Sequence, residues 1–231
     1  MPPSGVATLL PGTIRRSLLV GRFYLVIGTA ISTILALELA LGRHHLFAST
    51  FPLEVPIFAI LGSMGCLTIF TADRTKGVFE YLIAYGVRPQ ALFASSVLAS
   101  LAVTTVMLGA ILAVGLGIFY GSGGSTTPDL EKNLALYTFP MSYAGSIFAT
   151  TVGMYWSSLS TPRMGMNSPV GIAPFFGIGP TIVVLIIAET APASEYYDIT
   201  AGVAGIIVAV SAILLASSGK IMRRERFLSL T

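Results

Sequence analysis

The chain has 231 residues, of which 54% are hydrophobic and only 10% are charged, whereas an ordinary soluble domain carries about 25% charged residues. This composition excludes a water-soluble globular domain and predicts an all-α protein embedded in a lipid bilayer. The formal charge of +3 is spread over separate loops and forms no single basic patch, so we expect no nucleic-acid partner. The single cysteine, Cys66, excludes both an intramolecular disulfide and a multi-cysteine metal site.

Six apolar stretches are each long enough to cross the hydrocarbon core of a bilayer, which takes about 20 residues of α-helix. We therefore predict one polytopic membrane domain over residues 1–231, with about six transmembrane helices. The predicted helices occupy residues 18–41, 52–70, 91–120, 134–157, 170–188 and 199–218. Residues 1–17 are predicted to be a cytoplasmic or interfacial N-terminus, and residues 219–231 a basic cytoplasmic tail.

Lysine and arginine residues indicate which side of the membrane each loop faces, because positive residues near helix ends stay preferentially on the cytoplasmic side. Most of them precede the first predicted helix, follow the sixth, or lie between helices 2 and 3 or helices 4 and 5. Only Arg43 and Lys132 lie in loops that this assignment places outside. The distribution predicts a multi-pass protein of the cell membrane with both termini in the cytoplasm.

The interval between the second and third predicted helices, residues 71–90, is neither a bare turn nor a membrane span. If it is helical from about Thr75, its apolar residues share one face at the spacing of an amphipathic helix. These residues are Val78, Phe79, Leu82, Ile83 and Gly86. Lys76 and Glu80 can pair on another face, and Gly86 with Pro89 is expected to end the helix. On these grounds alone, the segment could be an interfacial helix that only packs on the membrane surface.

Residues 73–83 of this interval read Asp-Arg-Thr-Lys-Gly-Val-Phe-Glu-Tyr-Leu-Ile. This order resembles the cytoplasmic loop of type-2 ABC exporter permeases. The pattern of that family is an acidic residue and Arg, two variable positions, Gly, Thr or Ser, a bulky apolar residue, Glu, and paired Leu residues. The matching positions are Asp73, Arg74, Gly77, Phe79, Glu80, Leu82 and Ile83. Val78 departs from the hydroxyl residue that is usual in the family.

The resemblance implies that this segment, together with Arg88, forms a coupling helix that docks on a separate ATP-binding cassette ATPase subunit. It also implies a permease subunit of an ATP-driven exporter, in which two copies or two related permeases form the substrate pathway as a dimer. This chain is then not an enzyme and holds no cofactor, because the partner ATPase would bind ATP and Mg²⁺. Lys220 does not belong to a phosphate-binding loop, since Ile221 follows it where Ser or Thr is required.

Two places in the predicted membrane helices are candidates for the substrate path. Glu38 lies near the outer end of the first helix, where an ionisable group either faces a water-filled path or reaches the outer interface. The fifth helix contains Pro174, Gly177 and Pro180. Such a helix is either broken to line a transport site or bent and closely packed, which is the interpretation we favour.

A metal site is not expected. His44 and His45 are adjacent in the first external turn, and the sequence offers no further ligands that would complete a coordination shell.

A second hypothesis is a non-catalytic membrane anchor or assembly subunit of a larger membrane complex, which accounts equally well for the scarcity of buried charges. A secondary transporter ranks third, because it would need more ionisable residues in the middle of the membrane than Glu38 supplies. The sequence does not indicate the transported substrate.

Overall fold

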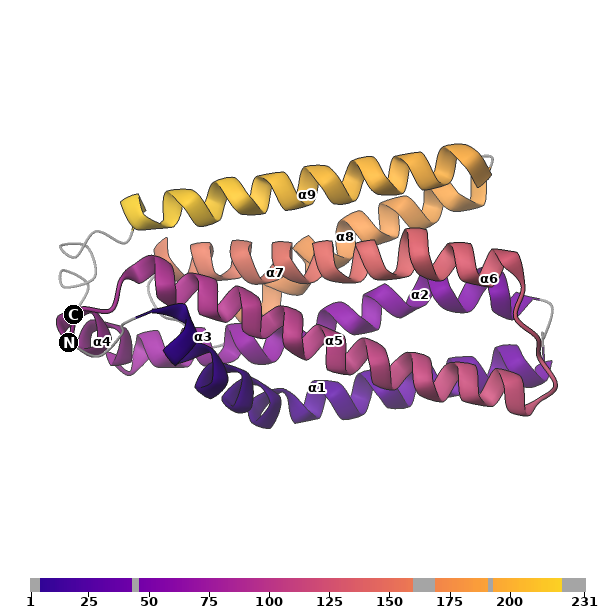
Figure 1. The fold of residues 1–231 in the computed structure, drawn as a ribbon, viewed down its shortest axis with the longest axis horizontal. Helices are drawn as coiled ribbons and strands as arrows, with labels where there is room; N and C mark the ends of the chain where they lie inside the picture. The colour runs from indigo at the N-terminus through magenta and orange to yellow at the C-terminus, as the bar shows by residue number, and fades with distance from the viewer. Residues whose placement is uncertain (1–4, 43–45, 160–168, 191–192, 222–231) are drawn as a thin grey trace.

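The structure, a computed structural model, describes residues 5–42, 46–159, 169–190 and 193–221. All secondary structure in these residues is helical, which confirms the all-α fold class. The elements in chain order are α1 (Val6–Gly42), α2 (Phe47–Gly62), α3 (Met64–Thr75), α4 (Val78–Ala84), α5 (Pro89–Gly121), α6 (Pro128–Asn133), the π-helical turn η2 (Leu134–Thr138), α7 (Phe139–Leu159), α8 (Pro169–Thr190) and α9 (Ala193–Ile221). The long helices lie side by side along one axis and form an elongated bundle (Figure 1).

Four helical stretches among the described residues are long and apolar enough to cross a membrane: Val6–Gly42, Phe47–Thr75, Pro89–Gly121 and Glu195–Ser218. A shorter apolar helix covers Ile172–Ile187. These helices indicate a membrane protein, while the prediction of six spans stays a prediction. The start of α1, the short helix α4 and the end of α9 lie at the same end of the bundle, which we name the α4 end (Figure 1). Which side of the membrane this end faces also stays a prediction.

The first helix is longer than predicted, because α1 begins at Val6 and not near residue 18. Pro11 lies inside it, although proline removes one backbone hydrogen bond and disfavours the helix interior. The early turns are nevertheless helical because Leu9, Leu10 and Ile14 pack against buried residues of α3 and α5. Tertiary packing of an apolar face therefore outweighs the local preference of proline.

The predicted helix over residues 52–70 is divided in two. α2 ends at Gly62 and α3 begins at Met64, with Ser63 between them. The Ser63 hydroxyl is buried and donates a hydrogen bond to the Ile60 carbonyl at 2.7 Å. This bond satisfies a polar group that would otherwise be costly to bury inside the bundle. The predicted positions of α5 and α7 agree with the structure within a few residues at each end.

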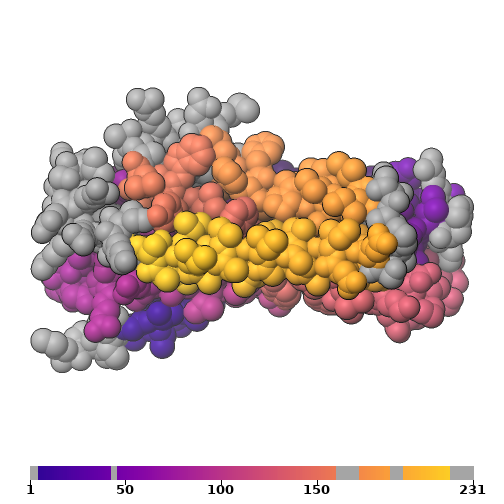
Figure 2. Space-filling view, turned by 90° about the horizontal axis from the view of Figure 1, so that it is seen from above, coloured from indigo at the N-terminus to yellow at the C-terminus, as the bar shows by residue number. Residues whose placement is uncertain are grey.

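The buried hydrophobic residues of the described chain form four clusters, two of which are built around phenylalanine rings. Away from the α4 end, the ring of Phe47 stacks on those of Phe51 and Phe119, with centroids 4.7 Å and 4.2 Å away. At the α4 end, the rings of Phe70, Phe79 and Phe93 meet beside residues of α3, α5 and α7. On the surface, by contrast, apolar side chains are exposed. Figure 2 shows α9 lying along one face of the molecule. Its Ile206 and Ile213 are 66% and 68% exposed, as expected of a helix that faces lipid.

Candidate functional site

The segment that resembles a coupling loop forms a short helix between two glycine turns. Gly77 precedes α4 with a φ of +71°, and Gly86 follows it with a φ of +89°, a backbone region that residues with a Cβ adopt at a cost. The Val87 amide donates to the Leu82 carbonyl at 3.0 Å and thereby closes the end of the helix. The short helix predicted between the second and third helices is therefore present as α4, at the end of the bundle (Figure 1).

The inner face of α4 is anchored in the aromatic core. Phe79 is 4% exposed, and its ring centroid lies 4.8 Å from that of Phe70. Phe70 in turn contacts Phe93 of α5 edge to face at 5.1 Å. Leu82 and Ile83 are partly buried against the same cluster. These apolar contacts hold α4 against both α3 and α5, as the amphipathic pattern predicts.

Asp73 and Arg74 precede the turn into α4 and are both buried, at 7% and 8% exposure. The Asp73 carboxylate accepts two hydrogen bonds from the guanidinium group of Arg16 on α1, at 2.6 Å and 2.8 Å. A paired, planar arrangement of this kind is the strongest form of charge-assisted hydrogen bond. Arg16 is not among the site residues predicted from the sequence, because its position before the first predicted helix indicates only topology.

Glu80 lies on α4 close enough to Arg74 for the two charges to attract each other. The Oε2 atom of Glu80 is buried and has no hydrogen-bond partner in the described structure. The predicted pairing of Lys76 with Glu80 is wrong, since no ion pair joins these two described residues and Lys76 is exposed. The reason is local geometry: Lys76 caps α3, and the left-handed turn at Gly77 takes it out of the helix that carries Glu80.

The outer face of α4 carries two exposed aromatic residues that the sequence analysis did not single out. Tyr81 and Tyr85 are 61% and 71% exposed, and their ring centroids lie 4.5 Å apart. Lys76 before the helix and Arg88 after it are exposed as well. Their spacing of four residues on a short amphipathic helix is the signal that could have revealed the tyrosine pair. This face therefore presents two aromatic rings to the surroundings with a positive charge on either side of them.

The first turns of α1 lie beside α4. A cavity of about 260 Å³ separates the two helices and is lined on one side by residues such as Leu9 and Arg16, and on the other by Phe79 and Leu82. Ser95 and Ser96 of α5 complete the wall. The end of α3 that leads into α4 is therefore tied to α1 through the Arg16–Asp73 ion pair, and the same two residues line part of the cavity wall.

The structure does not bring the predicted substrate-path residues into one site. Glu38 is exposed on α1 and interacts electrostatically with Glu54 on α2. On α8, Gly177 is buried, and Pro174 and Pro180 are partly buried. α1 packs mainly on α2, α3 and α5, whereas α8 packs on α2, α3, α7 and α9. The two sets of candidates consequently belong to different parts of the bundle.

Gly177 of α8 lies directly against α7. A Cβ atom at this position would lie 2.6 Å from the Gly145 carbonyl oxygen and 3.0 Å from the Ala149 Cβ atom. These distances favour the packing interpretation for Gly177, because only a residue without a side chain permits the approach.

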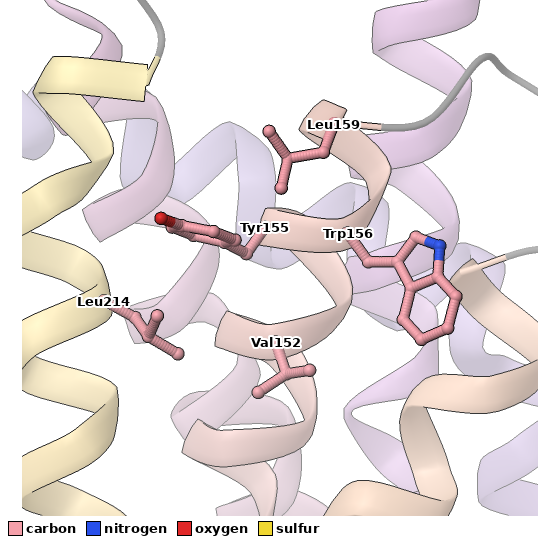
Figure 3. A pocket seen from close by; sticks show the side chains of 5 residues that line it. All are labelled: Val152, Tyr155, Trp156, Leu159 and Leu214. Carbon is pink, nitrogen blue, oxygen red and sulfur yellow. The ribbon is translucent and has the colours of Figure 1, made fainter.

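An apolar pocket of about 460 Å³ lies between α7 and α9 (Figure 3). Figure 3 shows Tyr155 pointing from α7 towards Leu214 of α9, and Trp156 pointing away from it. The Trp156 ring lies 6.2 Å from Phe176 of α8. The side chains that line this pocket are aliphatic or aromatic, so the pocket suits an apolar group better than a polar one.

Among the described residues, no group of three or more histidine, cysteine or acidic side chains could hold a metal ion. The predicted external residues Arg43, His44 and His45, and most of the predicted basic tail, lie outside the described residues. No protein-family model, curated protein or solved structure matches the chain.

Proposed function

We propose that the protein is the membrane-spanning permease subunit of an ATP-driven exporter of the ABC type, with about six transmembrane helices and cytoplasmic termini. The observation that carries the proposal is α4. This short helix has an inner face packed into the core and an outer face open to a partner. It contains Phe79, Glu80, Leu82 and Ile83 of the residues that resemble a coupling loop, and the other matching residues, Asp73, Arg74 and Gly77, directly precede it. In this proposal, ATP and Mg²⁺ are bound by a separate ATPase subunit, and transport is the activity of this chain.

An element that transmits force from a partner to a membrane domain must be rigid on the side of its own protein. α4 meets this requirement, since Phe79 packs on Phe70 and the preceding turn is fixed by Asp73 and Arg16. It must also offer a contact that excludes water. Tyr81 and Tyr85 supply such a contact, because exposed aromatic residues contribute most strongly to binding at protein interfaces.

The substrate pathway, in this proposal, is formed between two copies of the chain or between this chain and a related permease. α1 presents a long exposed apolar face that lipid or a second subunit would cover. The exposed residues of that face include Leu19, Phe23, Val26, Ile34 and Leu41.

The test is co-purification from native membranes, followed by mass spectrometry and an assay of Mg²⁺-dependent ATP hydrolysis. We expect an ATPase to co-purify with the unaltered chain. The amount of ATPase that co-purifies should fall at least about tenfold with the double variant Tyr81→Ala/Tyr85→Ala. The matched control is Tyr120→Ala, which removes a tyrosine that is 44% exposed at the opposite end of the bundle.

Two results would overturn the proposal. If the ATPase binds the double variant as well as the unaltered chain, α4 is not the coupling element. If the chain instead co-purifies with membrane subunits and no ATPase, it is an anchor or assembly subunit of a larger complex.

A further inference from the structure

Six hydroxyl side chains line the buried contact between α5 and α7. On each helix they recur every four residues, which places them on one face. None is more than 7% exposed. The residues are Ser96, Ser100 and Thr104 on α5, and Ser142, Ser146 and Thr150 on α7. We call this set the hydroxyl ladder.

The two helices run in opposite directions, and the middle of the ladder is paired. Ser100 shares a hydrogen bond of 2.7 Å with Thr150, and Thr104 donates to Ser146 at 2.9 Å. Beside the ladder, Thr105 of α5 shares a third interhelical bond of 3.1 Å with the Tyr143 hydroxyl of α7.

The two end members of the ladder bond to their own helices. Ser96 donates to the Leu92 carbonyl at 3.0 Å, and Ser142 donates to the Thr138 carbonyl at 2.6 Å. Continuing the register of the two hydrogen-bonded pairs by one turn in each direction places Ser96 across from Met154, and Ser142 across from Leu108. Each helix therefore carries one hydroxyl more than this register uses.

We infer that the α5–α7 interface has a second stable register, one helical turn away, and that α5 can slide between the two. A shift of four residues, about 6 Å, leaves every hydroxyl of the ladder paired across the interface. The new pairs are Ser96 with Thr150, Ser100 with Ser146, and Thr104 with Ser142. The shift gives up the bond between Thr105 and Tyr143, so both registers contain three interhelical hydrogen bonds.

The slide has a definite direction. Ser146 is one turn further from the α4 end than Thr150, so Ser100 reaches it when α5 moves away from that end relative to α7. A shift in the opposite direction would place Ser142 and Ser146 opposite Leu112 and Leu108, which cannot accept or donate hydrogen bonds. Intermediate positions break the pairs inside an apolar interior, where unsatisfied polar groups are costly. The interface is consequently expected to have two discrete states, as one-turn ratchets do.

Cysteine pairs distinguish the registers, because a disulfide requires Cα atoms about 4.4–6.8 Å apart. In a Cys66→Ala chain, Ser100→Cys/Thr150→Cys reports the present register, and Ser100→Cys/Ser146→Cys reports the shifted one. Thr104→Cys/Thr150→Cys is the control, since it is one turn out of the present register, as the shifted pair is, but in the direction that the slide does not take. A protease site in the loop at residues 121–127 lets each cross-link be read in native membranes as two fragments that stay joined.

We expect the shifted pair to cross-link measurably above the control, and its ratio to the present pair to respond to two further variants in opposite directions. Tyr143→Phe removes a bond made only in the present register and raises the ratio about threefold, whereas Ser142→Ala removes one made only in the shifted register and lowers it about threefold. Cross-linking of the shifted pair no greater than the control, or a response of the same sign to both variants, overturns the inference. These readouts need no ATPase and are independent of the proposed function.

Discussion

The guanidinium group of Arg16 forms two hydrogen bonds with the carboxylate of Asp73, and so joins α1 to α3 directly before the turn into α4. The Asp73 side chain is only 10% exposed, while that of Arg16 is 55% exposed. The buried partner therefore depends on the exposed one for its hydrogen bonds.

Arg16→Ala is expected to lower the free energy of unfolding by about 1–3 kcal/mol, because it leaves a buried carboxylate unpaired. Thermal unfolding in detergent measures the effect. Arg15→Ala is the control, since Arg15 is exposed on the same helix and should change stability by less than about 0.5 kcal/mol. Partial recovery in the exchanged variant Arg16→Asp/Asp73→Arg would attribute the loss to the ion pair, and equal losses for Arg15→Ala and Arg16→Ala would contradict the assignment.

Phe79→Ala should destabilise the protein by about 3–5 kcal/mol, the usual cost of removing a buried phenylalanine ring. The ring is 4% exposed and packs on Phe70. Tyr81→Ala removes an aromatic ring from the opposite face of the same helix and is expected to cost less than about 0.5 kcal/mol. Comparing the two unfolding midpoints tests whether α4 is anchored by one face only. Similar losses for both variants would show that it is not.

Gly77→Ala is predicted to cost about 1–2 kcal/mol, because the φ of +71° at this position is unfavourable for a residue with a Cβ atom. The open space around Gly109 on α5 makes Gly109→Ala the appropriate comparison. That substitution is in a helix interior and should be neutral or stabilising. Gly77→Asn should lose less than Gly77→Ala, since asparagine tolerates the left-handed region better. An unaltered unfolding midpoint for Gly77→Ala would argue against the turn.

Gly177→Ala should weaken the contact between α7 and α8 and lower stability by about 1–3 kcal/mol through overpacking. The new Cβ atom would lie 2.6 Å from the Gly145 carbonyl oxygen. Gly179→Ala, two residues further along α8, meets nothing within 4 Å and is the matched control. If both variants unfold at the same temperature, close packing at Gly177 is not what holds α8 in place.

The helices that could be predicted from the sequence are those whose apolar residues follow a local pattern. α4 was predicted because its apolar face and its two glycines lie within a short stretch of sequence, and α5 because its apolar run is uninterrupted. The Arg16–Asp73 pair could not be predicted, since its partners are 57 residues apart and only the packing of α1 on α3 brings them together. The early start of α1 was missed for the same kind of reason. Pro11 is a local signal against a helix, and the contacts of Leu9 that outweigh it are not local.

The hydroxyl ladder is a second feature that could not be predicted from the sequence. Serine and threonine at intervals of four residues on α5 and α7 can be read from the sequence, but a hydroxyl in a membrane helix can bond to its own backbone as well as to a neighbour. Thr104 and Ser146 were therefore equally compatible with isolated helices and with a paired interface. Only the register of the two helices distinguishes these possibilities, and register is a property of the folded bundle.

The face that fixes α4 and the face that it exposes share no residue. Phe79 is buried and stabilises the folded bundle, whereas Tyr81 and Tyr85 are exposed and are expected to contribute little to its stability. Substitutions at the two tyrosines are consequently expected to be nearly neutral for stability. The exposed face of α4 can therefore change in sequence during evolution while the fold of the bundle is preserved. Under the proposed function, a few substitutions at Tyr81 and Tyr85 would therefore change which partner α4 binds while leaving the folded bundle unchanged.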